Sequence, residues 1–127
     1  MKFEHLALNV TDPVAMADWY VAHLGMRVLR SRDDTPYTRF LADSAGCIFF
    51  ELYAKPEAGC PDYAGIPAAR FHFGFLSEAI AGDKARLVQA GATLVSEDTT
   101  RDGSTCVTLR DPWGVCFQVT ARTKRWV

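Results

Sequence analysis

Four side chains that can ligate a metal ion occur in this chain as two pairs with the same spacing. His5 and His72 are 67 residues apart, and Glu51 and Gln118 are also 67 residues apart. Two imidazoles, one carboxylate and one amide oxygen suit a divalent ion such as Zn²⁺, Ni²⁺, Co²⁺, Fe²⁺ or Mn²⁺. In an octahedral shell, four protein ligands leave two positions for water or substrate, which is the open site that catalysis requires. The spacing predicts a duplicated chain whose halves each supply two ligands to one metal ion.

The same interval relates the elements that must position these residues. Strand-like alternation occurs in the first half at 3–10, 27–31, 38–42 and 47–53, with a helix that starts at Asp12 and Pro13 and ends at Gly25. The second half repeats this order, with strands predicted at 70–76, 93–96, 105–110 and 115–120 and a helix centred on 84–89. An Asp-x-x-Gly motif also recurs, at 43–46 and 111–114. The predicted fold is therefore α+β, with two tandem βαβββ modules.

A connector separates the two halves. Residues 54–69 hold three prolines and two glycines and show no clear period. The predicted organisation is one domain spanning 1–127, with module one at about 1–53, the linker at 54–69, module two at about 70–120 and a tail at 121–127. A chain of 127 residues has the usual length of a single domain.

The alternation of each strand decides where the candidate ligands point. It places all four on the face away from the helices: His5, Glu51, His72 and Gln118. The small residues Ala7 and Gly74 flank the histidines on that face and leave room for a bound molecule. A carboxylate within the apolar run around Glu51 would cost several kcal/mol if it were buried without a partner. We therefore expect Glu51 to be solvated, paired or coordinated.

Other interpretations of these residues stay open at this point. A lone strand histidine is more often structural than a ligand, and only the matched positions favour a metal role. Gln118 is a weaker ligand than a carboxylate, so it either binds the metal or forms a hydrogen bond within the cavity. Three arginines could contact an anionic substrate group or simply form a solvated strand edge: Arg30, Arg32 and Arg39.

Composition argues against several classes of partner. Fourteen basic and 15 acidic residues give a net charge of −1, so no field attracts nucleic acid or an anionic membrane. Four cysteines are too sparse and irregular for a disulfide scaffold, and the chain has no CxxC pair. The N-terminal sequence lacks the features of a secretory signal, and no apolar run approaches the length of a membrane span. We expect a cytoplasmic protein that acts on a small molecule.

These features together resemble the vicinal oxygen chelate superfamily. The resemblance rests on the paired modules, the opening HLALNVTDPVAMADWYVAHLGM, the close RDPWGVCFQVT and the four ligand positions, and it covers about residues 3–120. This superfamily includes glyoxalase I, methylmalonyl-CoA epimerase, extradiol ring-cleaving dioxygenases, and fosfomycin and bleomycin resistance proteins. The resemblance implies an eight-stranded, open, barrel-like cup around a metal ion, and a homodimer.

Within the superfamily, the chain is similar to glyoxalase I in length and at His5, Glu51 and His72. Gln118 stands where the bacterial pattern has a second glutamate, so the resemblance implies that Glu51 is the base. We predict a metal-dependent lyase or isomerase of the glyoxalase I type that moves a proton on a small carbonyl substrate, with a thiol such as glutathione as a candidate cosubstrate. The alternatives are an Fe²⁺-dependent extradiol dioxygenase, and a non-catalytic or thiol-transferase drug-resistance protein.

Overall fold

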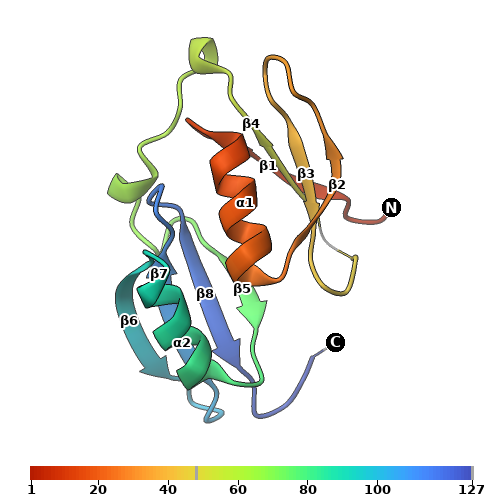
Figure 1. Cartoon of the computed structure of the whole chain (residues 1–127). Coiled ribbons are helices and arrows are strands. Elements are labelled where there is room, and N and C mark those ends of the chain that lie inside the picture. The colour runs from red at the N-terminus through yellow and green to blue at the C-terminus, as the bar shows by residue number, and fades with distance from the viewer. Residues whose placement is uncertain (48, 127) are drawn as a thin grey trace. The chain divides into compact units, whose positions relative to one another are not determined.

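The computed structural model describes residues 1–47 and 49–126, and the chain divides into two compact units, Met1–Pro61 and a second unit that starts at Asp62. The elements of the first unit are β1 (His5–Asn9), α1 (Pro13–Leu24), β2 (Arg27–Ser31), β3 (Arg39–Ala42) and β4 (Phe49–Tyr53) (Figure 1). Those of the second are β5 (Phe73–Leu76), α2 (Ile80–Gln89), β6 (Thr93–Thr99), β7 (Thr105–Arg110) and β8 (Cys116–Ala121).

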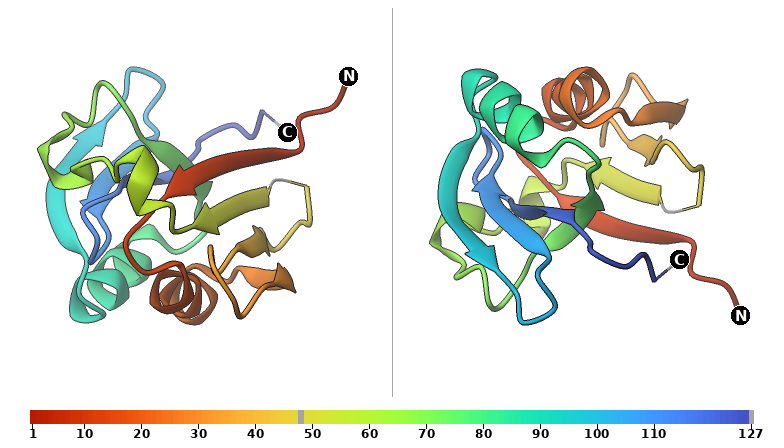
Figure 2. Two further views of the ribbon diagram at one scale, coloured as in Figure 1. Left: turned by 90° about the horizontal axis from the view of Figure 1, so that it is seen from above. Right: turned by 90° about the horizontal axis from the view of Figure 1, so that it is seen from below.

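Each unit contains one open four-stranded sheet, and the two sheets share one topology. Their strand orders are β1-β4-β3-β2 and β5-β8-β7-β6. In each sheet the first strand pairs in parallel with the last, and the remaining pairs are antiparallel. Helix α1 packs against β2, β3 and β4, and α2 packs against β7 and β8 (Figure 2). The prediction of an α+β fold with two tandem βαβββ modules is confirmed.

Helix α1 begins and ends where the sequence predicts. The Asp12 carboxylate accepts a hydrogen bond from the backbone N–H of Ala15 at 3.0 Å, which satisfies one of the free donors at the helix start. Gly25 adopts a left-handed conformation with φ +67°, which stops the helix. Tyr20 is fully buried and meets Phe50 of β4 edge-on, with ring centroids 6.3 Å apart. This contact fixes α1 on one face of its sheet.

The sequence located only the centre of helix α2, at 84–89, and left its first residue undefined. The helix starts at Ile80 and lacks a capping side chain at Ala79. Ser77 takes over this role, because its hydroxyl accepts from the backbone N–H of Ala79 at 3.0 Å and donates to Asp83 at 2.6 Å. The hydrogen bond from Ser77, followed by the contact with Arg86, lowers the pKa of the Asp83 carboxyl.

Strands β2 and β7 have the predicted boundaries, and the other strands differ from theirs by one to three residues. Strand β5 begins at Phe73 rather than at 70, because the backbone N–H of Arg70 bonds to the carbonyl of Pro67 and forms a turn. Strand β6 extends to Thr99, because its pairing with β7 continues that far. The predicted strand at 47–53 includes Ile48, which lies outside the described residues, and the described strand is Phe49–Tyr53.

The connector contains two short 3₁₀ helices, Pro56–Ala58 and Tyr63–Gly65. One side chain of the first unit holds its beginning: the Asn9 amide accepts from the N–H of Lys55 at 2.8 Å and donates to the carbonyls of Lys55 and Gly59 at 2.8 and 3.2 Å. The Arg110 guanidinium of the second unit donates to the carbonyls of Tyr63 and Ile66 at 3.0 and 2.7 Å. Both parts of the connector are therefore fixed by side-chain hydrogen bonds.

Neither described helix has the length and apolar character needed to cross a bilayer.

Candidate functional site

The interval of 67 residues corresponds to equivalent positions in the two sheets. In the first unit, Ala7 of β1 lies directly opposite Glu51 of β4. In the second unit, Gly74 of β5 lies directly opposite Gln118 of β8. Each residue of the second pair follows its counterpart by 67 positions. Because directly opposite residues project from the same face of a sheet, the carboxylate and the amide occupy matching places beside a small residue.

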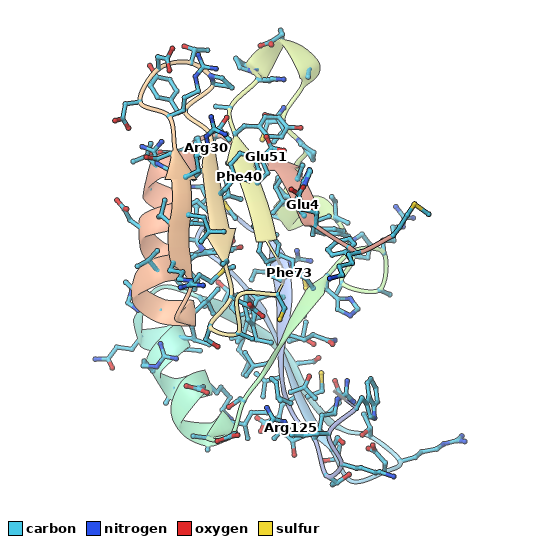
Figure 3. The ribbon with its side chains drawn as sticks, turned by 90° about the vertical axis from the view of Figure 1, so that its right-hand side faces the viewer. Glu4, Arg30, Phe40, Glu51, Phe73 and Arg125 are labelled. Carbon is cyan, nitrogen blue, oxygen red and sulfur yellow. The ribbon has the colours of Figure 1, made fainter. Side chains whose placement is uncertain are left out.

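The first unit brings His5 and Glu51 together. Nε2 of His5 lies 3.5 Å from Oε2 of Glu51, and the two side chains are 37% and 25% exposed. On its other side, Nδ1 of His5 lies 2.5 Å from a carboxylate oxygen of Glu4. The His5 ring also meets Phe40 edge-on at 6.2 Å between centroids. These three partners of the imidazole, Glu4, Phe40 and Glu51, are labelled in Figure 3.

The hydrogen bond to Glu4 decides what the other nitrogen of His5 can do. An ionised carboxylate only accepts hydrogen bonds, so Nδ1 of His5 carries a proton. In the neutral ring, the lone pair of Nε2 then faces the Glu51 carboxylate, and two acceptors at this distance need a cation between them. Metal–ligand bonds of about 2.1 Å separate two ligands by about 3.0 Å at a right angle and about 3.4 Å at a tetrahedral angle. The observed 3.5 Å fits a shared metal ion, and it equally fits a proton on Nε2.

The second unit prepares its histidine in the same way. His72 lies immediately before β5, and its Nδ1 is 2.7 Å from the carbonyl oxygen of Ala68. A carbonyl can only accept, so Nδ1 donates and Nε2 is left with a lone pair in the neutral ring. Metal-binding histidines commonly donate their second ring N–H to a carboxylate or a backbone carbonyl. The acceptor is the Glu4 carboxylate in the first unit and the Ala68 carbonyl in the second.

Gln118 is oriented by a neighbouring hydroxyl. Its Nε2 donates to Oγ1 of Thr108 at 3.2 Å, and Thr108 lies directly opposite it on β7. Among the described residues, Oε1 of Gln118 receives no hydrogen bond, so the oxygen is the end of this amide that can bind a ligand. The hydrogen bond within the site and the metal role, which the sequence left as alternatives, are therefore compatible.

A pocket of about 350 Å³ covers this part of the second unit. It is lined by His72, Phe73, Gly74, Phe75, Leu76, Gln118, Thr120 and Arg122. The guanidinium of Arg122 lies 3.9 Å from the ring centroid of Trp126. The sequence placed both residues in a tail, but Arg122 is one of the residues that line this pocket.

Each unit supplies only a pair of candidate ligands. In the described ranges 1–47 and 49–126, no group of three or more His, Cys, Asp or Glu side chains is arranged to hold a metal ion. The supporting contacts of Glu4, the Ala68 carbonyl and Thr108 were not predicted from the sequence. Of these three, only the contact of Thr108 could have been expected from the sequence, because pairing of the last two strands places Thr108 opposite Gln118.

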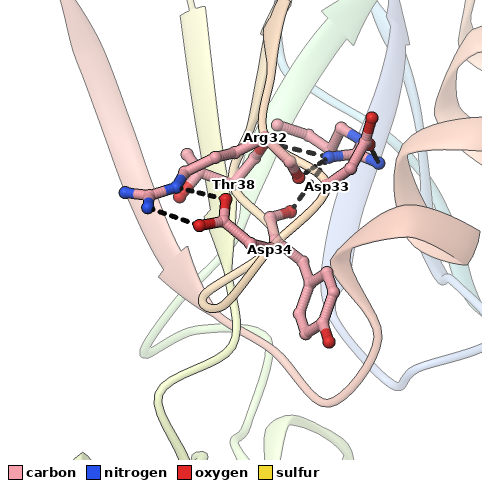
Figure 4. Close-up of polar contacts among 6 residues, drawn as sticks. Arg32, Asp33, Asp34 and Thr38 are labelled. Carbon is pink, nitrogen blue, oxygen red and sulfur yellow. Dashed lines mark hydrogen bonds and ion pairs between the residues drawn. The ribbon is translucent and has the colours of Figure 1, made fainter.

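The three arginines of the first unit differ in their partners. Arg32 binds Asp34 through two hydrogen bonds of 2.7 and 2.8 Å, and the hydrogen bond from Arg32 is the main cause that lowers the pKa of Asp34 (Figure 4). Arg39 binds Asp33 at 3.0 Å and also donates to the carbonyl of Arg32. Arg30 has no hydrogen bond or ion pair with any described residue. Two of the three therefore stabilise the β2–β3 loop, and Arg30 does not.

Comparison with known proteins identifies a family and a fold. The model of the family described as glyoxalase-like domain matches residues 5–120. No curated protein matches the chain.

Three solved structures illustrate the range of proteins with this fold. A glyoxalase/bleomycin resistance protein/dioxygenase family enzyme from Burkholderia phytofirmans PsJN shares 21% identity, with a TM-score of 0.76 over 95% of this chain and 98% of that chain. TnmS3, an antibiotic binding protein from Streptomyces sp. CB03234, shares 15% identity, with a TM-score of 0.75 over 97% of both chains. A glyoxalase-related enzyme from Fulvimarina pelagi shares 17% identity, with a TM-score of 0.69 over 96% of this chain and 88% of that chain. The fold is thus found in both enzymes and binding proteins.

Proposed function

The chain belongs to the glyoxalase-like domain family of the vicinal oxygen chelate superfamily, and we propose that it is a metal-dependent lyase or isomerase that moves a proton on a small carbonyl substrate. One observation carries the proposal. In both units a histidine, His5 or His72, bonds through Nδ1 to an oxygen acceptor and so keeps Nε2 available for a metal ion. Glu51 and Gln118 complete the proposed ligand set, one beside each histidine in the equivalent strand.

The proposed chemistry assigns different tasks to these side chains. A bound divalent ion would polarise the substrate carbonyl and so acidify the neighbouring C–H bond. Glu51 takes the proton from that carbon and returns it to the adjacent carbon. Glu4 holds the orientation of His5, and Thr108 holds that of Gln118. Gln118 has no proton-accepting carboxylate, so Glu51 is the base.

Metal analysis of the purified protein tests the first half of this proposal. Protein reconstituted separately with Ni²⁺, Zn²⁺, Co²⁺, Fe²⁺ or Mn²⁺ should retain about one ion per chain after desalting. His5→Ala and His72→Ala should each lose that ion, because each removes one of the four ligands. His23→Gln, which changes the third histidine of the chain and lies on α1, serves as the matched control. Wild-type protein that retains none of the five ions would overturn the proposal.

A mixing experiment decides whether the ligand pairs of one site come from one chain or from two, and it also tests the proposed homodimer. His5→Ala and His72→Ala proteins are unfolded together, refolded and reloaded with metal. A site shared between subunits regains about a quarter of the wild-type metal content, because half of the chains form mixed dimers and each mixed dimer has one intact site. A site formed within one chain regains none.

Activity assays test the second half. The metal-loaded protein is given a 2-oxoaldehyde such as methylglyoxal, with and without glutathione, and product formation is followed in D₂O by NMR. Proton transfer predicts a product whose new C–H position exchanges partly with solvent. Oxygen uptake with a catechol on the Fe²⁺ form would favour ring cleavage instead.

A non-catalytic binding function is the second candidate. It is supported by the aromatic pocket of the second unit, where Phe73 and Phe75 lie beside His72 and Gln118, and by the fold shared with an antibiotic binding protein. A protein of this kind binds an aromatic ligand equally well with and without metal. Binding that depends on the metal ion favours the enzyme.

A further inference from the structure

One row of side chains crosses the sheet of the first unit on the face that carries Glu51. Arg30 of β2 lies opposite Phe40 of β3, Phe40 lies opposite Glu51 of β4, and Glu51 lies opposite Ala7 of β1. Directly opposite residues share a face, so these four side chains project to the same side. Figure 3 shows Arg30, Phe40 and Glu51 next to one another on neighbouring strands.

A β-bulge puts Arg30 into this row. The pairing of β2 with β3 shifts between Val28 and Arg30, so Leu29 is the extra residue. Without the bulge, Leu29 would lie opposite Phe40 and Arg30 would point to the other face. Bulges commonly re-aim a side chain beside a functional site. The strand irregularity therefore turns a cation toward the side of the sheet that carries the proposed base.

The guanidinium of Arg30 is available for a ligand. Arg32 and Arg39 are both engaged by aspartates of the β2–β3 loop, whereas Arg30 has no hydrogen bond or ion pair among the described residues. Two strand spacings separate Arg30 from Glu51, which is about 10 Å. The aromatic ring of Phe40 lies between them in the row. The result is a cation, an apolar surface and a carboxylate in order along one line.

We infer that Arg30 binds a carboxylate at the far end of the substrate, and that the body of the substrate crosses Phe40 to reach Glu51. This inference rests on the proposed function, because it takes the His5–Glu51 end of the row as the reacting end. The substrate class is a small carbonyl compound with an apolar or planar spacer and an anionic carboxylate. A guanidinium can bind such a carboxylate through two parallel hydrogen bonds.

Two inert metal chelators test this inference on the metal-loaded protein: benzohydroxamate and 4-carboxybenzohydroxamate. They differ only in the carboxylate opposite the chelating group. Calorimetric titration of wild type should give about tenfold tighter binding of the carboxylated compound, which corresponds to the low end of the range for a hydrogen bond to a charged group because Arg30 is exposed. Arg30→Gln should reduce this ratio to about one and leave the affinity for benzohydroxamate unchanged. Arg30→Lys should keep an intermediate ratio, because it retains the charge and loses the planar fork.

Arg32→Gln is the charge-matched control. It removes an equal charge two residues away from Arg30, and the side chain that it removes is already bound to Asp34. It should keep the wild-type ratio. Equal loss of preference in Arg32→Gln and Arg30→Gln would overturn the inference in favour of a general field effect. Benzohydroxamate binding without a carboxylate preference in wild type would overturn the role of Arg30 alone. No benzohydroxamate binding to wild type would overturn the proposed metal site and this inference with it.

Discussion

The two units have the same strand register across one row of four positions, but the side chains at these positions differ in charge and polarity. In the first unit the row runs Arg30, Phe40, Glu51 and Ala7. In the second unit the equivalent row runs Ser96, Thr108, Gln118 and Gly74. Even the bulge is repeated, because the register of β6 shifts between Leu94 and Ser96 as that of β2 shifts between Val28 and Arg30.

The difference shows how duplication can divide the work of a site. The first row contains a cation, an aromatic ring and a carboxylate, so it can recognise charge and move a proton. The second row contains two hydroxyls and an amide, and Thr108 fixes the orientation of Gln118. Strand register, which sets direction, is common to both rows. Side-chain type, which sets chemistry, has changed at three of the four positions from charged or aromatic to neutral and polar.

Exchanging the functional groups of Glu51 and Gln118 tests this division most strongly. Glu51→Gln gives the first row the same amide that the second row has and removes the proposed base, so turnover should fall by about 10²–10⁴-fold. Steady-state assays of metal-loaded protein measure the loss, and Glu57→Gln in the exposed 3₁₀ helix is the control.

The double variant Glu51→Gln/Gln118→Glu moves the carboxylate to the second row. Partial recovery of turnover would show that the two rows are chemically interchangeable. Full turnover in Glu51→Gln alone would remove Glu51 as the base.

Loss of the support behind His5 should have the next largest effect. Glu4→Ala removes the acceptor of Nδ1, and outer partners of this kind are worth about 10–100-fold in metal affinity. His72 is held by a backbone carbonyl, so no side-chain substitution weakens the second unit in the same way. Competition with a metal-binding dye measures the affinity. An unchanged affinity in Glu4→Ala would mean that His5 does not bind the metal through Nε2.

Thr108→Val should have a smaller effect that is confined to the second row. The substitution keeps the shape of a buried side chain and removes the hydroxyl that accepts from Gln118. Loss of one neutral hydrogen bond costs about 1 kcal/mol of stability. Urea unfolding measures this cost. Metal affinity should also fall, because the amide oxygen loses its orientation, and no change in affinity would argue that Gln118 does not bind the metal.

The loops beside the two rows give the smallest effect. The pKa of Asp34 is lowered mainly by the hydrogen bond from Arg32, and that of Asp102 is lowered to about 2 by hydrogen bonds from Thr100 and Ser104. Both folded-state pKa values lie below the ordinary 3.8, so both groups stabilise the fold above that pH and lose their contribution as the pH falls through the lowered values.

Salt should distinguish the two loops. Added NaCl screens Arg32 and should raise the pKa of Asp34. The pKa of Asp102 should change less, because hydrogen bonds from the neutral Thr100 and Ser104 lower it most and the charge of Arg122 is the smallest cause. NMR titration of the carboxyl carbons at low and high salt measures both. Equal shifts for the two carboxyls would contradict the distinction between charged and neutral partners.

Alternation and internal repetition were enough to predict the modules and the relation between Glu51 and Gln118. Alternation follows from the two-residue period of a strand, the repeat follows from the matching order of elements in the two halves, and the sequence displays both directly. The repeat therefore predicted equivalent places for these residues, and the sheet registers have them.

The rest depended on departures from regular geometry. The bulge at Leu29 reverses the face of Arg30, and simple alternation cannot detect an added residue. Adjacent residues of a regular strand project from opposite faces, so alternation gives no reason to expect Glu4 at the ring of His5. Glu4 precedes β1, and its side chain can therefore turn back to Nδ1. The Ala68 carbonyl is set by a turn of the connector, where backbone direction depends on contacts that are distant in sequence.

The fixed connector has a consequence for how the protein resists degradation. Proteases prefer exposed loops that can leave the surface and enter a cleavage groove. A proline- and glycine-rich stretch would normally be such a target. Here the Asn9 side chain donates hydrogen bonds to the carbonyls of Lys55 and Gly59, and the Arg110 side chain donates to those of Tyr63 and Ile66. Native chains should therefore be cut slowly between β4 and β5, and Asn9 and Arg110 protect peptide bonds that neither residue borders.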